Sequence, residues 1–139
     1  MEILNWRELN PSTFCSGQPS DTDWQALAAK GIKAVLNLCP PTQQGEPEQS
    51  MVEAAGMEYF NIPIAGPADF TDDAVSQFRQ LLVEKGDSLL VHCASGNRVG
   101  AMFALAAAAD GKSADEALQI GLAAGLTGLA PFIEARLGV

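Results

Sequence analysis

The chain has 139 residues, of which 47% are hydrophobic and 18% charged, so we expect residues 1–139 to form a single domain with its own core. Its formal net charge of −9 at pH 7 repels nucleic acid and anionic membranes, which argues against both as partners. An anionic substrate must therefore be captured by local groups.

Short apolar runs rich in β-branched residues alternate with helical patterns along the chain, and this alternation is typical of an α/β fold. The strand candidates are 32–38, 57–64 and 88–93, with 12–17 as a weaker fourth. From Val99 onward the sequence shows no strand pattern and predicts two or three helices rich in small residues. We therefore expect strands in the first two thirds and a helical final third.

Helix boundaries are predicted from capping residues. Ser20-Asp21-Thr22-Asp23 has the form of a capping box that opens a helix through Lys30, closed by Gly31. Thr71 is expected to cap a helix that ends near Gly86, and Ser113 with Glu116 to open another. Residues 40–48, rich in proline, glutamine and glycine, predict a surface loop before a helix that ends near Gly56.

Three features of the sequence indicate the cellular compartment of the protein: its first residues, its longest apolar run and its cysteines. The opening MEILNWRELN lacks the pattern of a secretion signal, and the apolar run 99–109 is too short to span a bilayer. Three cysteines, Cys15, Cys39 and Cys93, are an odd number without framework spacing, which favours free thiols in a reducing compartment. We expect a cytoplasmic protein without a membrane partner.

The stretch VHCASGNRVG, residues 91–100, carries the chemistry. It predicts a strand ending in Cys93, a short loop, and a helix that begins near Arg98. At the carboxyl end of a parallel strand, the amino terminus of the next helix offers unpaired N–H groups and a dipole that favour anions and a thiolate. Arg98 can fork onto two oxygens of an oxyanion, and Gly96 allows the loop backbone to turn toward it.

Each of these residues alone is more typical of packing or of a solvated surface, and only their combination favours an anion-binding thiol site. One histidine and three scattered cysteines lack the spacing of zinc ligands, so no metal and no organic cofactor is expected. His92 precedes the cysteine on the strand and faces the opposite side, so we expect it to orient the loop.

VHCASGNRVG resembles the catalytic loop of the cysteine-dependent protein tyrosine and dual-specificity phosphatases, whose motif is H-C-x-x-x-x-x-R followed by Ser or Thr. Together with residues 16–38 and 56–64, it is similar to the beta-lactamase-hydrolase-like phosphatase family, which has a shortened loop. The resemblance implies the dual-specificity phosphatase-like fold, a three-layer α/β structure with a mostly parallel central sheet of four to five strands. Oligomeric state is left open.

For function, the resemblance implies hydrolysis of a phosphomonoester, on a phosphorylated protein or a small molecule, through a cysteinyl-phosphate. Cys93 would be the nucleophile, Arg98 the oxyanion clamp, and the backbone of Ala94, Ser95, Gly96 and Asn97 the phosphate cradle. It also implies that the strand ending in Cys93 is central and flanked by those ending near Cys15 and Cys39. Packing is the simpler role of those two thiols, and Cys39 is the candidate resolving thiol for an oxidised Cys93.

The sequence differs from the phosphatase motif in three ways. Four residues separate Cys93 from Arg98 where the phosphatases have five, and this spacing also resembles the loop of rhodanese-type sulfurtransferases, which carry a persulfide. Val99 replaces the hydroxyl residue after the arginine, for which Ser95 or Asn97 would have to substitute.

The third difference concerns the general acid. Gly66 occupies the place of the catalytic aspartate, and Asp69 is the nearest replacement, with Asp72 and Asp73 placed to complement a helix dipole. A phosphatase is therefore the expected function, and two alternatives stay open: a sulfurtransferase that uses a Cys93 persulfide, which the sequence outside the loop supports less, and a phosphate- or phosphopeptide-binding module without turnover.

Overall fold

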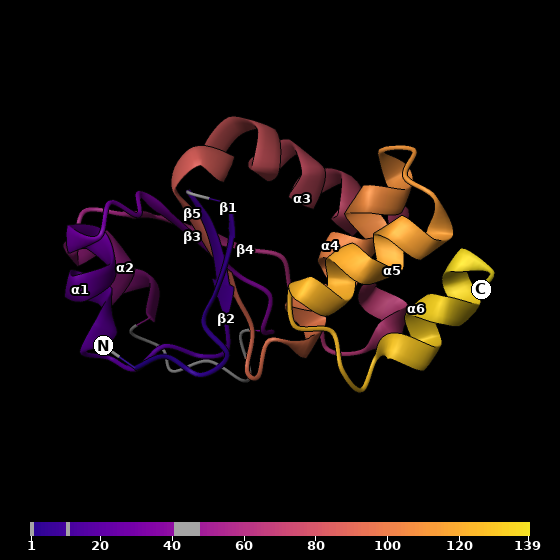
Figure 1. Cartoon of the computed structure of the whole chain (residues 1–139). Helices are drawn as coiled ribbons and strands as arrows, with labels where there is room; N and C mark the ends of the chain where they lie inside the picture. Colours follow the sequence, from indigo (N-terminus) through magenta and orange to yellow (C-terminus); the bar gives the residue numbers. More distant parts are fainter. Residues whose placement is uncertain (1, 11, 41–47) are drawn as a thin grey trace.

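A five-stranded sheet forms the centre of the computed structural model, which describes residues 2–10, 12–40 and 48–139. The strands lie in the order β1-β2-β5-β3-β4 (Figure 1). All neighbours are parallel except β1 and β2, so the predicted, mostly parallel sheet is confirmed. The strands are β1 (Arg7–Asn10), β2 (Thr13–Ser16), β3 (Ala34–Asn37), β4 (Glu58–Asn61) and β5 (Leu89–His92).

The strand before Cys93 is the middle one, with β2 on one side and β3 on the other. Val91 pairs in register with Cys15 and with Leu36, and all four residues of β5 are buried. Burial on both faces explains the continuous apolar run LLV in this strand. The predicted order of the three inner strands is thus confirmed.

β1 was not predicted by the sequence pattern. Its residues RELN are mostly polar, because it is an edge strand with one partner and its burial alternates along the strand. The predicted strand 57–64 is also shorter than expected and stops at Asn61. Beyond it, the amides of Ile62 and Ile64 still donate to the oxygens of Asn37 and Leu38, at 3.1 and 2.9 Å, so the chain stays beside the end of β3 although the strand itself has ended.

Helices cover both faces of the sheet. They are α1 (Asp23–Ala29), α2 (Glu48–Ala54), α3 (Asp72–Lys85), α4 (Asn97–Ala109), α5 (Ala114–Ala123) and α6 (Ala130–Leu137). Figure 1 shows α1 and α2 on one side of the strands and α3 to α6 on the other. The final third is helical, as predicted.

Two of the predicted caps are confirmed and one is wrong. Thr71 Oγ1 accepts from the amide of Ala74 at 3.1 Å, and Ser113 Oγ accepts from that of Glu116 at 3.2 Å. Ser20 does not cap α1, whose N-cap is Thr22. One half of the predicted box does form, because the Asp23 carboxylate accepts from the Ser20 amide at 2.8 Å and from its hydroxyl at 2.9 Å.

The predicted loop 40–48 lies largely on residues 41–47, outside the described residues. Its last residue, Glu48, was assigned to the wrong element, because it is the buried first residue of α2.

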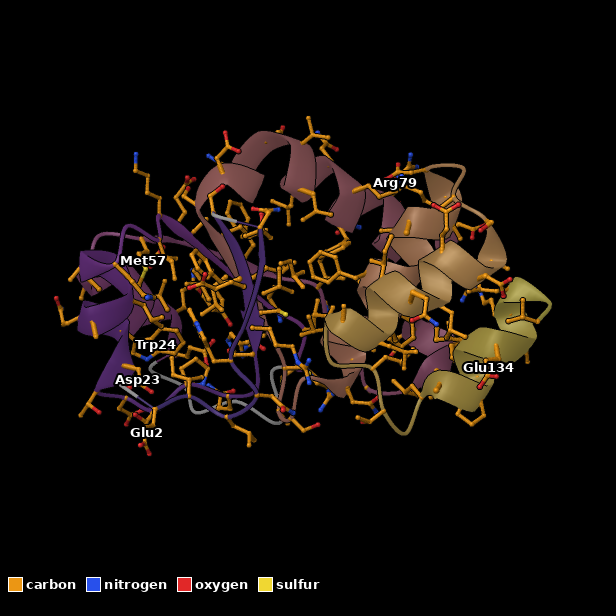
Figure 2. All side chains as sticks on the ribbon, in the orientation of Figure 1. Glu2, Asp23, Trp24, Met57, Arg79 and Glu134 are labelled. Atoms are coloured by element: carbon orange, nitrogen blue, oxygen red, sulfur yellow. The ribbon has the colours of Figure 1, made fainter. Side chains whose placement is uncertain are left out.

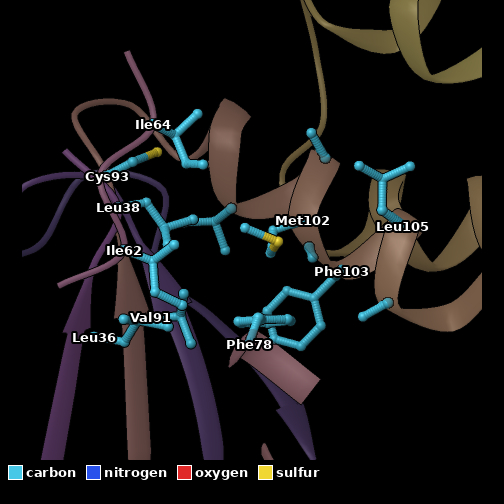
Figure 3. Packing of buried hydrophobic residues seen from close by; sticks show 14 of the residues in the cluster. Leu36, Leu38, Ile62, Ile64, Phe78, Val91, Cys93, Met102, Phe103 and Leu105 are labelled. Atoms are coloured by element: carbon cyan, nitrogen blue, oxygen red, sulfur yellow. The ribbon is translucent and has the colours of Figure 1, made fainter. Parts of the chain in front are cut away.

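Each face of the sheet has its own apolar core. On the α3–α6 face, Phe78 and Phe103 pack edge to face with ring centroids 4.9 Å apart, among the residues drawn in Figure 3. On the other face, Trp24 of α1 lies over the sheet (Figure 2). Cys93 belongs to the α3–α6 core and lies near Ile64 at one end of the cluster in Figure 3.

α4, which follows the Cys93 loop, packs very closely against α5. A Cβ atom at Gly100 would lie 2.1 Å from the Leu126 nitrogen and 2.7 Å from the Gly121 carbonyl oxygen. Only glycine allows this approach. The contact places the beginning of α4, and with it Arg98, relative to the helical layer.

None of the helices in the described ranges combines the length and apolar content that crossing a bilayer requires.

Candidate active site

Cys93 follows the last residue of the central strand and begins a four-residue loop that ends where α4 starts. Gly96 in this loop has φ 100°, in the left-handed region that glycine adopts without strain. In this conformation its N–H donates to Cys93 Sγ at 3.1 Å. The sulfur is fully buried, whereas Ala94 and Ser95 are exposed. The loop therefore wraps over the thiol and directs a backbone N–H at it.

Arg98 lies in the first turn of α4, partly buried. One of its terminal nitrogens donates to the carbonyl oxygen of Ile64 at 2.8 Å. The amides of the first helical turn lack partners one turn earlier and point out of the helix amino terminus. Arg98 and the amino terminus of α4 thus lie at the same end of the sheet as Cys93.

His92, the last residue of β5, lies on the other face of the sheet. Its Nε2 is 2.9 Å from Glu48 Oε2, and its Nδ1 is 3.3 Å from the carbonyl oxygen of Cys93. The ring is fully buried beside Trp24, with ring centroids 6.0 Å apart. His92 therefore contacts the loop from the face of the sheet opposite the thiol, through the carbonyl oxygen of Cys93.

Glu48 is the residue that the sequence analysis missed. It accepts from Gln18 Nε2 at 2.7 Å and from Asn37 Nδ2 at 3.0 Å, in addition to its contact with His92. Burial raises the pKa of this carboxyl, but the hydrogen bonds and the His92 ring more than offset the effect, so the pKa lies below its ordinary value. The only available signal was a carboxylate that opens a helix after a proline-rich stretch.

The two other cysteines lie on the segments beside β5: Cys15 belongs to β2, and Cys39 follows the end of β3. Burial is the main reason that the pKa of Cys15 is raised to about 12. The charge of Arg7 lowers this pKa, and Cys93 raises it further. Burial also raises the pKa of Cys39, which Arg98 lowers and Cys93 raises. Cys93 acts electrostatically on both thiols, and both favour the protonated form at neutral pH.

The loop after β4 holds the candidate acid. Asp69 is exposed at the end of the short 3-10 helix η2 (Pro67–Asp69), and its Oδ2 accepts from the Ala65 amide at 2.8 Å. Ala65 follows Ile64, whose carbonyl oxygen receives the Arg98 hydrogen bond. The structure therefore connects the Asp69 loop to Arg98 through two successive residues.

Asn97 and Val99, the two neighbours of Arg98 in the chain, contact different parts of the protein. Asn97 Oδ1 accepts from the amides of Thr127 at 2.9 Å and Leu129 at 3.1 Å, so it holds the connection between α5 and α6. Val99 is fully buried in the core of the α3–α6 face. Of the two substitutes considered for the missing hydroxyl, Ser95 is exposed on the loop, whereas the side-chain oxygen of Asn97 is engaged elsewhere.

Comparison with known proteins places this arrangement in a family. Residues 5–110 match the family described as beta-lactamase hydrolase-like protein, phosphatase-like domain. The chain is 33% identical over 109 residues to the beta-lactamase hydrolase-like protein of Agrobacterium fabrum, an alignment covering 75% of this chain and 25% of that protein. The chain thus spans about a quarter of the length of the curated relatives it matches.

Solved structures share the fold. A candidate phosphatase from Neisseria meningitidis is 28% identical, with a TM-score of 0.76 and 94% of each chain covered. The core catalytic domain of the PP-IP phosphatase SIW14 from S. cerevisiae is 16% identical, with a TM-score of 0.72, covering 96% of this chain and 86% of that one. From the sequence match and this shared three-layer architecture, the chain belongs to the phosphatase-like domain family of the beta-lactamase hydrolase-like proteins.

Proposed function

We propose that the protein hydrolyses phosphate monoesters with Cys93 as nucleophile and Arg98 as the clamp on the phosphate oxygens. The observation that carries the proposal is the hydrogen bond from the Gly96 amide to Cys93 Sγ, at the amino terminus of the helix that bears Arg98. This contact directs a backbone N–H and the helix amino terminus at the sulfur, the arrangement that an anion-binding site uses. Family membership agrees with this assignment.

In the first step, the Cys93 thiolate attacks phosphorus, the S–P bond forms and the bond to the ester oxygen breaks. Asp69 acts as the general acid and gives its proton to the leaving oxygen. Arg98 and the amides of the loop 94–97 neutralise charge on the remaining phosphate oxygens. In the second step, water attacks phosphorus, the S–P bond breaks, and the Asp69 carboxylate takes a proton from that water.

His92 is proposed as a positioning residue. Its Nδ1 faces the carbonyl oxygen of Cys93, and its Nε2 is held by Glu48, so the ring supports the loop from the opposite face of the sheet. We propose no metal or organic cofactor for this chemistry. The substrate is a phosphorylated protein or a small phosphomonoester, held by Arg98 and the loop amides against the net negative charge of −9.

The experiment is steady-state hydrolysis of an aryl phosphate by the wild type and two cysteine variants. We expect slow hydrolysis by the wild type, because the shortened loop offers one backbone donor fewer than the phosphatase motif. Cys93→Ser should abolish it, and Cys15→Ser, a change on the adjacent strand, should leave it within about twofold of wild type. Wild-type turnover by Cys93→Ser would assign the activity to another site and refute the proposal.

A parallel thiosulfate–cyanide assay tests the second candidate, a sulfurtransferase, which is favoured by the four-residue spacing between Cys93 and Arg98. Sulfur transfer that depends on Cys93, without phosphatase activity, would establish it. Binding of inorganic phosphate with neither activity would identify a binding module.

A further inference from the structure

Two carbonyl groups of the Cys93 loop accept hydrogen bonds from outside the loop. The backbone amide of Gln18 donates to the Ala94 oxygen at 2.9 Å, and the side-chain amide of Asn5 donates to the Ser95 oxygen at 2.6 Å. Asn5 lies 90 positions before Ser95 in the sequence. The beginning of the chain therefore contacts the backbone of the candidate catalytic loop.

The Asn5 contact determines where one N–H points. The Ser95 oxygen and the Gly96 nitrogen belong to the same planar peptide, and in a trans peptide the C=O and N–H point in opposite directions. At one end this peptide accepts from Asn5, and at the other its N–H donates to Cys93 Sγ at 3.1 Å. Gly96 has φ 100°, a conformation that glycine adopts without strain, so the residue itself adds little restraint and the Asn5 contact restrains the plane from outside the loop.

Asn5 is itself held in place. With φ 53° it is the only non-glycine residue of positive φ in the described ranges, and asparagine tolerates this left-handed conformation better than most residues. The preceding residue, Leu4, accepts at its carbonyl oxygen from the amide of Gly17, just after β2, at 2.7 Å. A fixed, unusual backbone conformation thus presents the Asn5 amide to the loop.

We propose that Asn5 is a positioning residue of the active site, which holds the Ser95–Gly96 peptide with its N–H toward the Cys93 sulfur. The inference rests on the proposed function of the same loop, and it assigns a role to the segment before the first strand. Without the Asn5 donor, the peptide can rotate about Gly96. The sulfur then loses a backbone hydrogen-bond donor. The backbone amides that would bind an oxyanion at the loop also become less ordered.

Three variants separate this role from general stability. Asn5→Gly keeps the left-handed backbone accessible and removes the donor, and Asn5→Asp keeps the shape but has no N–H. The matched control is Asn10→Ala. Asn10 Oδ1 accepts from the amides of Ser12 at 3.0 Å and Thr13 at 2.9 Å, so this change also removes asparagine hydrogen bonds, at the other end of β1 from Asn5.

The readouts do not depend on turnover. The first is the rate of Cys93 alkylation by iodoacetamide at about pH 7, followed by peptide mass spectrometry, because alkylation reports the reactivity of the sulfur itself. The second is affinity for orthovanadate, a phosphate-like oxyanion. Thermal unfolding accompanies both. We expect the alkylation rate and the vanadate affinity to fall roughly tenfold in both Asn5 variants and less than twofold in Asn10→Ala.

Wild-type alkylation and vanadate affinity in Asn5→Gly and Asn5→Asp would overturn the proposal. So would equal losses in Asn10→Ala at a matched loss of thermal stability. If the wild type hydrolyses no phosphate ester but the Asn5 variants still show the two losses, the proposed reaction fails while the positioning role stands.

Discussion

His92 and Glu48 are hydrogen-bonded with 2.9 Å between Nε2 and Oε2, and both side chains are buried although they lie 44 positions apart in the chain. One belongs to the strand before Cys93 and the other to the first turn of α2. The pair lies on the face of the sheet opposite the Cys93 side chain, and His92 contacts the Cys93 loop through the carbonyl oxygen of Cys93.

Glu48 should make stability depend on acid pH. Its pKa is lowered in the folded protein, so its contribution is fully present above the ordinary value of 4.5 and is lost as the pH falls through the lowered value. We expect Glu48→Gln to cost about 2 kcal/mol of unfolding free energy at neutral pH, and to flatten the decline in stability below about pH 4.5.

Denaturant unfolding at about pH 7, 5 and 3.5 measures this. Glu53→Gln, an exposed change on the same helix, is the control and should change unfolding by less than about 0.5 kcal/mol. An identical acid slope in Glu48→Gln and wild type would show that Glu48 is not the titrating group.

Asp69→Asn tests whether Asp69 is the general acid, because a poor leaving group depends on protonation more than a good one does. Asparagine can still accept from the Ala65 amide but cannot donate the catalytic proton. We expect hydrolysis of an alkyl phosphate to fall by about a hundredfold, and that of an activated aryl phosphate by less than about threefold. Asp73→Asn, exposed in the first turn of α3, should change neither rate. Equal losses for both ester types would argue against proton donation by Asp69.

Mild peroxide should oxidise Cys93 first and then link it to Cys39, with loss of water from the sulfenic acid. Leu38 donates its amide to the carbonyl oxygen of His92 at 2.9 Å, so the chain just before Cys39 runs beside the chain just before Cys93. Because burial raises the pKa of Cys39, its attack should accelerate as the pH rises from about 7 to 9.

Peptide mapping after peroxide treatment reads out the disulfide. Cys39→Ser should instead yield a sulfinic acid at Cys93, and Cys15→Ser should behave as wild type. A wild-type Cys93 over-oxidised to sulfinic acid, with both other thiols free, would leave Cys39 with a packing role only.

Gly100→Ala should destabilise the fold through the contact of α4 with α5. The new methyl group would lie 2.1 Å from the Leu126 nitrogen, which forces the backbone apart at a cost of about 3 kcal/mol. Gly111→Ala, at φ 94° but with no atom within 4 Å of the new methyl group, should cost about 1 kcal/mol. Equal losses in the two variants, measured by denaturant unfolding, would mean that the helices can separate without penalty.

The sequence by itself determined the inner strands, the loop at Cys93 and the caps at Thr71 and Ser113, because these features depend on neighbours within a few positions. Alternating or continuous apolar runs indicate strands, and a hydroxyl residue three positions before a helical N–H indicates a cap. The resemblance of VHCASGNRVG to a phosphatase loop led to the family, which the match over residues 5–110 confirms.

Tertiary structure alone decided the partners of that loop. Glu48 follows a proline-rich stretch and Asn5 precedes a polar edge strand, and neither position has a periodic pattern that reveals a distant contact. Glu48 reaches His92 because α2 packs on one face of the sheet, and Asn5 reaches Ser95 because β1 is antiparallel to β2 and so begins at the end of the sheet where the loop lies. Hydrogen bonds of this kind depend on which elements meet in space, and that is decided by packing across the whole sheet.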